Sequence, residues 1–310
     1  MEKKIAYFSN FHYWGLKSVI KKQRLLYPKK DRVQNQYTFK LTKKYIKEWN
    51  NLYGMDSNAQ NLYLTYQWPW VIQGLMETLI PDLGVNLKNY LHIGQEGKFL
   101  NTFTLGHKYI VTNRLLDVCA TERDRIIIIS ETNVIEDTGK EIYSCIDYSW
   151  VGNMSKKDML LLQESTYYNQ MSIDPVVEIG KRMKNPKLVN KSQYKTLKLY
   201  FNEKMGIRFG FVSGALNPTH TYKSLSPLFG HKKPFVQGMC TGNIIIKAFT
   251  QDLNEILEEC SMFFCGKIFL PQVLELRYNE DDYELFSRDN KVVAYGKRKQ
   301  KFKSTTIKSA

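Results

Sequence analysis

The residues with the clearest chemical potential lie in two short segments of the second half of the chain. The first reads Phe-Val-Ser-Gly-Ala-Leu-Asn-Pro-Thr-His and ends at His220. The second reads Pro-Phe-Val-Gln-Gly-Met and places Gly238 near the start of an expected helix. An imidazole exchanges a proton near neutral pH, and the first N–H groups of a helix are unpaired and favour negative charge. Groups of these two kinds are what proton transfer beside a carbonyl requires.

These segments resemble the signature of MaoC-like and (R)-specific enoyl-CoA hydratases. That family reads Ser-Gly-Asp-x-Asn-Pro-(Ile/Leu)-His, then a Phe-Gly or Gly-Phe step, then His-Gly-Met at the start of a long helix. Further matches are Phe269-Leu270-Pro271 and the closing Val-Ala-Tyr-Gly at residues 293–296. Leu-His-Ile-Gly-Gln-Glu at residues 91–96 resembles an element of the family's members with two fused hot-dog domains. The resemblance covers roughly residues 60–300 and is specific at residues 213–220.

The resemblance implies a role for each matching residue. His220 matches the catalytic histidine, and Gly238 matches the glycine whose amide faces the thioester oxygen. Asn217 matches the asparagine that orders the catalytic loop. Ser213 matches a turn residue, and Ser-Gly-Ala is not the G-x-S-x-G elbow of a nucleophilic serine. The positions expected to line the substrate site are Ser213, Ala215, Gln237 and Thr241.

The chain also departs from the family pattern. Ala215 stands where the family has an aspartate, which together with the histidine holds the reacting water. Gln237 replaces the histidine before the helix glycine, and Thr219 replaces an aliphatic residue. Removing one member of an acid–base pair typically costs about 10²–10⁴-fold in rate. The resemblance therefore predicts a hydratase- or dehydratase-type lyase with altered chemistry.

Three interpretations of this altered site remain open. His220 acts alone, in a reaction with one proton transfer, such as double-bond isomerisation or cyclisation by Michael addition. A carboxylate from elsewhere substitutes, for which Asp252 and Glu255 on the expected helix are candidates. Alternatively, the domain binds acyl thioesters or their carrier without turnover. We favour altered catalysis, because His220 and Gly238 are both present.

The remaining histidines and cysteines carry weaker patterns. His92 is expected to be structural, because its match is to a non-catalytic element. His12 and His107 are expected on the surface or in loops, and His231 near the mouth of the site. Cys240 follows the expected helix start, where a thiolate is stabilised, but a buried packing thiol is favoured. The five cysteines are odd in number and form no C-x-x-C pair, which favours a reducing compartment over disulfides or zinc.

Composition limits the partners. Lys and Arg number 45 against 30 Asp and Glu, giving a net charge of +15 that attracts anionic partners. Coenzyme A and acyl carrier protein fit this charge, whereas nucleic acid is disfavoured because RNP-like aromatic and zinc-finger patterns are absent from the sequence. The sequence shows no P-loop, Rossmann, HExxH or EF-hand motif, so we expect no metal and no cofactor. An apolar stretch of membrane-spanning length and a secretion signal are both missing, which predicts a cytoplasmic protein.

The pattern of elements predicts an α+β fold built twice. Pro-Trp-Val-Ile-Gln-Gly at residues 69–74 and Pro-Phe-Val-Gln-Gly at residues 234–238 each open an expected helix, over residues 70–80 and 234–259. Strands are expected around each of these helices. A further helix is expected over residues 41–52. The expected strands are residues 62–67, 109–116, 125–133, 142–151, 197–200, 268–270, 273–278, 283–286 and 292–295.

A long helix wrapped by a curved antiparallel sheet is the hot-dog arrangement, and two copies make a double hot dog. The expected division is an N-terminal hot-dog domain at residues 1–158, a linker at residues 159–194 and a C-terminal MaoC-like domain at residues 195–310 with a basic tail. Two fused domains bury what one hot dog buries by dimerising, although a homodimer of the whole chain stays open. The acyl pocket is expected between the halves, in a protein of fatty acid or polyketide metabolism.

Overall fold

The structure is a computed structural model of the chain of 310 residues. It describes residues 34–54, 90–120, 126–152, 156, 160, 168–170, 174–190, 192, 194–213, 218–223, 226–229 and 231–300. The strand expected at residues 62–67 and the helix expected at residues 70–80 lie outside the described residues. The same is true of residues 214–217, which include Ala215 and Asn217.

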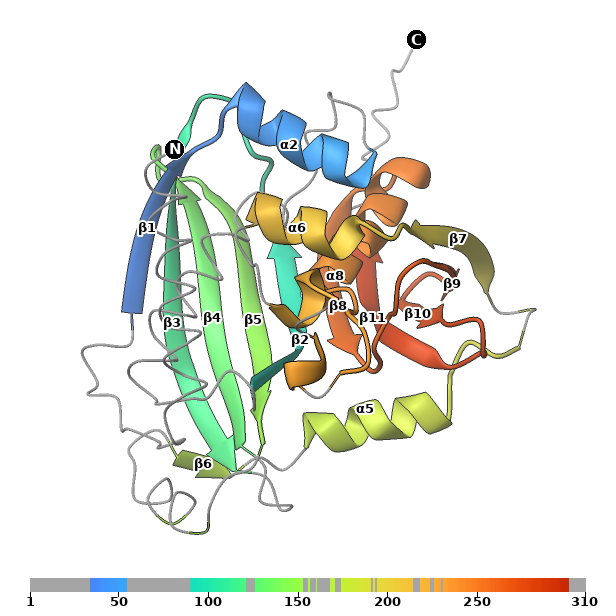
Figure 1. Cartoon of the computed structure of the whole chain (residues 1–310). Coiled ribbons are helices and arrows are strands. Elements are labelled where there is room, and N and C mark those ends of the chain that lie inside the picture. The colour runs from blue at the N-terminus through green and yellow to red at the C-terminus, as the bar shows by residue number, and fades with distance from the viewer. Residues whose placement is uncertain are drawn as a thin grey trace.

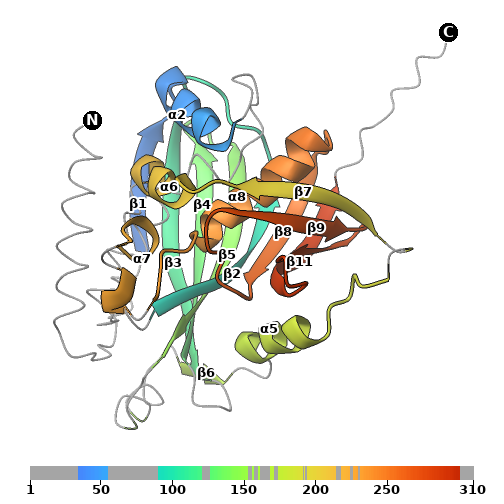
Figure 2. The same cartoon turned by 45° about the vertical axis from the view of Figure 1, so that its right-hand side comes forward.

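Within the described residues, one sheet of 11 strands runs through the molecule (Figures 1 and 2). Its order is β1-β3-β4-β5-β2-β8-β11-β10-β9-β7, all antiparallel, and β6 adds a parallel pair with β3. The pairing of β2 with β8 therefore joins the strands of the first half to those of the second. The strands are β1 Gln34–Lys40, β2 Tyr90–Phe99, β3 Lys108–Ala120, β4 Ile126–Glu136, β5 Glu141–Val151, β6 Tyr168–Gln170, β7 Lys195–Phe201, β8 Leu257–Phe264, β9 Gln272–Tyr278, β10 Asp282–Phe286 and β11 Val292–Gln300.

Alternating burial gives the sheet two faces. On β5 every second residue, from Tyr143 to Val151, is buried, as expected when successive side chains point to opposite sides. We call the face that carries Tyr143 and Asp147 the inner face. The helices α2 (Lys43–Tyr53), α6 (Met205–Ser213) and α8 (Gly238–Lys247) belong to its apolar cluster. The opposite, outer face packs against α5 (Pro175–Lys184) through Ile179.

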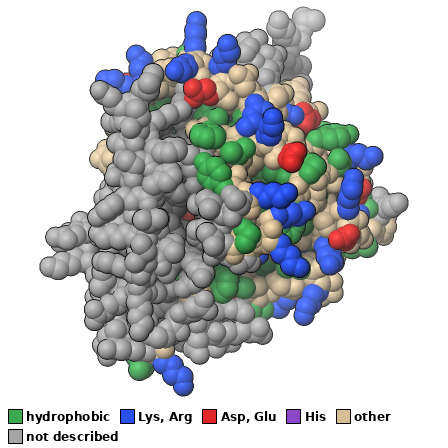
Figure 3. Space-filling model, viewed as in Figure 1, with side chains coloured by type: hydrophobic (Ala, Val, Ile, Leu, Met, Phe, Trp, Pro, Cys, Tyr) green, Lys and Arg blue, Asp and Glu red, His purple; other side chains and the backbone are tan. Residues whose placement is uncertain are grey.

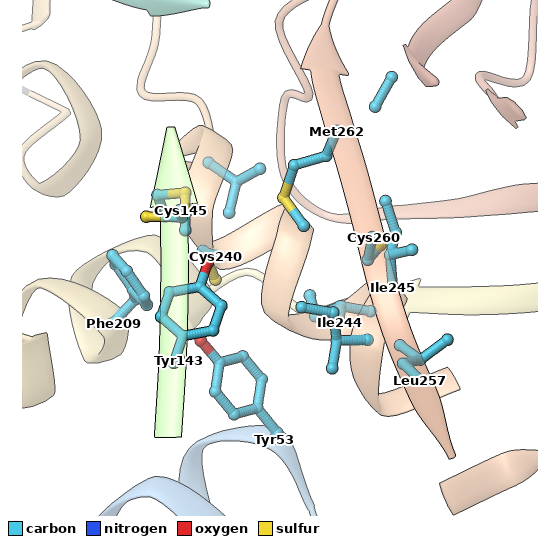
Figure 4. Close-up of a cluster of buried hydrophobic side chains, with 14 of the residues drawn as sticks. Tyr53, Tyr143, Cys145, Phe209, Cys240, Ile244, Ile245, Leu257, Cys260 and Met262 are labelled. Carbon is cyan, nitrogen blue, oxygen red and sulfur yellow. The ribbon is translucent and has the colours of Figure 1, made fainter. Parts of the chain in front are cut away.

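The core of the inner face is formed by side chains that are far apart in sequence (Figure 4). The ring of Trp49 on α2 meets Phe209 on α6 edge to face, with centroids 6.0 Å apart. Figure 4 shows Tyr53 and Tyr143 beside Cys240 of α8. Burial raises the pKa of the Cys240 thiol well above its ordinary value, so the thiol packs in the core, as the sequence favoured.

The helix expected over residues 234–259 is shorter than predicted. α8 begins at Gly238 and continues into a π-helical turn, η4, at Ala248–Asp252. Asn254 has a φ of 52°, in the left-handed region that ends helices. Residues from Leu257 onward belong to β8, and Ile256 is 36% exposed rather than on a buried helix face. The expectation was therefore wrong for residues 234–237, where Phe235 makes a β-bridge, and for residues 253–259.

Most other predicted elements are confirmed, and the strands are longer than expected. The helix at residues 41–52 is α2, and the strands at 109–116, 125–133, 142–151 and 197–200 are β3, β4, β5 and β7. The expectations for 273–278, 283–286 and 292–295 are confirmed as β9, β10 and β11, which also takes in the start of the basic tail. The strand expected at residues 268–270 was wrong, because only Phe269 makes an isolated bridge, to Phe235.

The expected linker contains a helix that the sequence analysis missed. α5 begins after Asp174, whose side chain accepts a hydrogen bond from the N–H of Val176 at 2.9 Å, with Pro175 at the first helical position. An aspartate cap followed by proline is an ordinary helix start signal. The C-terminal end of α5 is held by Glu284 on β10, which pairs with Arg182 at 3.2 Å. The domain division at residues 158 and 195 stays a prediction.

Candidate active site

His220 lies on the short helix α7, Pro218–Thr221. Its Nδ1 is 2.8 Å from the carbonyl oxygen of Phe235. A carbonyl oxygen only accepts a hydrogen bond, so Nδ1 carries the proton and Nε2 of the neutral ring holds a lone pair. Burial lowers the pKa of His220 to about 4. The ring is therefore neutral at physiological pH, and its Nε2 can accept a proton.

Gly238 opens α8, directly after Gln237. A Cβ on Gly238 would lie 2.8 Å from the ring of Phe264 on β8, so only glycine allows the helix start to approach the sheet this closely. The side chain of Gln237 does not cap α8. Its Nε2 instead donates to the carbonyl oxygen of Gly206 at 3.2 Å. The dipole and unpaired N–H groups of this helix start can stabilise a developing negative charge.

Gly206 on α6 is where the segments of His220 and Gly238 meet. The position of a Cβ on Gly206 is 2.8 Å from the carbonyl oxygen of His220 and 3.6 Å from Oε1 of Gln237. The ring of His220 also meets the ring of Phe235 edge to face, with centroids 4.6 Å apart. The chain is thus folded so that α7 and the residues leading into α8 contact the same glycine. Gly206 was missed from the sequence because it belongs to no recognisable motif, and Phe235 was noted only as part of the segment before Gly238.

The other predicted site residues occupy different surroundings. Thr241 is buried on α8, and its Oγ1 donates to the carbonyl oxygen of Gln237 at 3.4 Å. Ser213 is buried at the end of α6, and its Oγ donates to the carbonyl oxygen of Phe209 at 2.7 Å. These hydroxyl groups therefore bond backbone carbonyls in the elements around Gly206.

The two carboxylates considered as substitutes are engaged elsewhere. Asp252 lies at the end of η4 and pairs with Lys247 at 3.1 Å. Glu255 follows the helix rather than lying on it, and pairs with Arg298 of β11. Both candidate carboxylates therefore form ion pairs at the far end of α8 or beyond it, and Glu255 does not lie on a helix as expected.

Cationic side chains and aromatic rings lie around Phe235, whose ring contacts His220. The ring of His231 meets Phe235 edge to face at 5.0 Å, and Nζ of Lys267 is 3.0 Å from Nδ1 of His231. Partial burial, together with the charge of Lys267, lowers the pKa of His231. Lys233 lies over the ring of Phe269, which itself contacts Phe235. On the face seen in Figure 3, Lys and Arg side chains are spread over the described surface.

In the described part of the chain, no group of three or more histidine, cysteine, aspartate or glutamate side chains is arranged to hold a metal ion. Within the same residues, no helix combines the length and apolarity needed to cross a bilayer.

The sheet with its helices and the placement of α8 define a double hot-dog fold. No family model matches the sequence, and no curated protein matches it. Among solved structures, the chain is similar to HtdX of Mycobacterium tuberculosis, with 13% identity, a TM-score of 0.61 and coverage of 86% of this chain and 100% of that one. A MaoC-like dehydratase from Phytophthora capsici gives 12% identity, a TM-score of 0.63 and coverage of 88% and 98%. A Mycobacterium tuberculosis protein described as a double hot dog is 9% identical, with a TM-score of 0.54 and coverage of 87% of this chain and 96% of that one.

Proposed function

We propose that the chain is a MaoC-like lyase that adds water to, or removes it from, acyl thioesters of coenzyme A or acyl carrier protein. The observation that carries this proposal is the neutral His220, whose Nδ1 is committed to the Phe235 carbonyl so that Nε2 is the proton acceptor. The helix start at Gly238 follows Gln237, whose side chain bonds to Gly206, and it supplies the second requirement. The structural neighbours support the proposal at the level of the fold.

Hydration by one histidine balances without another reactant. The oxygen of water bonds to Cβ of an enoyl thioester while Nε2 of His220 takes the proton. The electron pair of the double bond moves toward the thioester carbonyl, whose oxygen is stabilised at the start of α8. The imidazolium then returns the proton to Cα, which restores the neutral ring. Because burial lowers the pKa of His220 to about 4, its protonated form is a stronger acid than an ordinary imidazolium. This favours return of the proton to Cα and makes Nε2 a weaker base toward water.

The charge around the site supports a phosphate-bearing carrier. Lys233 and Lys267 lie over the rings of Phe269 and Phe235, next to His220. Coenzyme A and the phosphopantetheine arm of acyl carrier protein are both anionic, so either is attracted to this side of the molecule. We propose that the pocket takes the acyl chain between the halves, with Asn217, Ser213, Ala215, Gln237 and Thr241 around it. Cytoplasmic location and action without a metal or cofactor belong to the same proposal.

Ala215 favours a second candidate reaction on the same scaffold. Without the family's aspartate, a reaction that moves one proton is easier to support than one that also positions water. Double-bond isomerisation and intramolecular Michael addition are reactions of this kind.

The test uses the full chain with crotonyl-CoA and longer enoyl thioesters, each also loaded on acyl carrier protein. Hydration that falls by about 10²-fold or more in His220→Ala supports the lyase. If the wild type is inactive and Ala215→Asp creates hydration, the native reaction is not hydration. If neither chain acts on or binds any thioester, the proposed function is refuted.

A further inference from the structure

Exposed cations gather on α2, on α6 and directly after α7. We call them the basic face, which consists of Lys43, Lys44 and Lys47 of α2, Lys204 and Arg208 of α6, and Lys223 after α7. Against these six cations, residues 43–53, 202–213 and 218–223 carry two carboxylates, Glu48 and Glu203. Figure 3 shows Lys and Arg side chains at the top of the molecule, where Figure 1 places α2. A local surplus of positive charge attracts anionic partners.

Around α5 and on the strands, by contrast, several cations are neutralised. Arg182 pairs with Glu284 at 3.2 Å and Lys187 with Asp282 at 3.7 Å. Further ion pairs are Arg114–Glu131, Lys181–Glu178, Lys247–Asp252, Arg277–Glu275, Arg298–Glu255 and Lys299–Glu258. Among the described side chains, no carboxylate forms an ion pair with a cation of the basic face. Its positive charge is therefore available to a partner.

The helices of the basic face are held against the segment that carries His220. Nη2 of Arg208 donates to the carbonyl oxygen of Asn51 on α2 at 2.8 Å. α6 also contacts α7, and Gly206 approaches the carbonyl oxygen of His220. Lys204 and Arg208 each lie two residues from Gly206, so they point away from α7 on a helix about 10 Å across. Figures 1 and 2 both show α6 between α2 and the orange segment that contains α7.

Two large aromatic side chains are exposed among these cations. Phe211 on α6 is 56% exposed, and Tyr222, directly before Lys223, is 38% exposed. Aromatic residues and arginine are enriched at protein–protein interfaces, where they anchor the contact. Packed helices lie about 8–10 Å apart, so a surface reaching from α2 across α6 to α7 is about 16–20 Å wide. This width and these aromatics fit the surface of an acidic protein better than a single phosphate group.

We propose that the basic face is the docking surface for an acidic acyl carrier protein, whose acyl-bearing arm then enters the site of His220 and Gly238. The inference rests on the proposed function and narrows its substrate class to protein-bound thioesters. Complementary charge steers the encounter and fixes its orientation. Coenzyme A has no protein surface, so its thioesters reach the site without using the basic face.

The test compares crotonyl-acyl carrier protein with crotonyl-CoA as substrates of the full chain. Lys47→Glu combined with Lys204→Glu reverses one charge on each helix. We expect this variant to weaken binding of fluorescein-labelled crotonyl-acyl carrier protein, and to raise its KM, by at least about 10-fold. The KM for crotonyl-CoA should change by less than about 2-fold. Phe211→Ser should also weaken carrier binding, and wild-type binding should weaken as salt rises from about 0.05 M to about 0.5 M.

The controls lie on α5, on the opposite side of the sheet. Lys181→Glu combined with Lys184→Glu changes the net charge by the same amount at exposed positions. Met183→Ser matches Phe211→Ser, since Met183 is 41% exposed. We expect both controls to bind the carrier as the wild type does, and far-UV circular dichroism confirms that each variant is folded. Equal weakening in controls and test variants overturns the inference, as does an equal loss with both substrates.

Other anions and the proposed function give separate outcomes. The inference is also wrong if duplex DNA, or vesicles of phosphatidylglycerol and phosphatidylcholine, bind the basic face more tightly than the carrier protein does. Hydration of crotonyl-CoA without binding of the carrier protein overturns the inference and leaves the proposed function intact. Carrier binding that depends on the basic face, without turnover of any thioester, refutes the proposed lyase and upholds the docking surface.

Discussion

Replacing His220 with asparagine should reduce the loss of stability in acid. An unfolded histidine has a pKa of about 6.5, whereas burial lowers the pKa of His220 to about 4 in the folded chain. Protons therefore bind the unfolded chain more tightly, and stability that is complete above about pH 6.5 is lost as the pH falls toward about 4. Asparagine has no charge to gain, and its amide N–H can still donate to the Phe235 carbonyl.

The size of the effect follows from the two pKa values. Their difference corresponds to about 3 kcal/mol when the pH lies below both, since one pKa unit is about 1.36 kcal/mol. At about pH 4.5 the wild type should have lost about 2.5 kcal/mol relative to His220→Asn, compared with their difference at about pH 7.5. Carboxylates titrate in both proteins, so this comparison cancels their contribution.

Urea unfolding at both pH values measures the free energies, with equal m-values as the check that both chains unfold alike. His107→Asn gives the baseline for removing another histidine. Independently, the imidazole resonance that disappears in His220→Asn should titrate near pH 4 in the wild type. A pH-independent stability difference, together with a titration near about pH 6.5, would refute the burial and protonation state assigned to His220.

Three more predictions concern stability and reactivity. Glu284→Ala should destabilise the chain by about 3–5 kcal/mol in urea unfolding, because its buried carboxylate accepts hydrogen bonds from Arg182 and from the N–H groups at residues 187 and 188. As the control, Glu178→Ala breaks an exposed ion pair and should cost less than about 1 kcal/mol. Equal costs for the two substitutions would contradict the structure. Gly206→Ala should lower the melting temperature, because the new Cβ would lie 2.8 Å from the His220 carbonyl oxygen. In the control Gly180→Ala in α5, the new Cβ meets no atom within 4 Å, and the substitution should stabilise the chain by about 0.5–1 kcal/mol. An unchanged melting temperature in Gly206→Ala would show that the contact with His220 is absent. Because burial raises the pKa of all five thiols, Ellman's reagent at neutral pH should react slowly with the folded chain and rapidly after unfolding; one fast thiol in the folded state would disprove that burial.

The sequence by itself predicted the architecture and the identity of the candidate groups. The β-branched run at Ile126–Ile129 indicated a buried strand, and it lies in β4. The motif from Ser213 to His220 resembles that of MaoC-like hot-dog proteins. The structural neighbours of the chain include a MaoC-like dehydratase. Such signals are local, because propensity and motif spacing depend on residues that are close in the chain.

Only the tertiary structure decided which groups meet. Burial of the ring lowers the pKa of His220, and the hydrogen bond to the Phe235 carbonyl opposes this shift. The position of Gln237 depends on Gly206 of another helix. From the sequence, His92 was expected to be structural, because its match is to a non-catalytic element. Asp147 reaches it from a neighbouring strand through a register that one extra residue shifts. Strand register and bulges are set by packing across the whole sheet, so no local pattern in the chain could have revealed this pair.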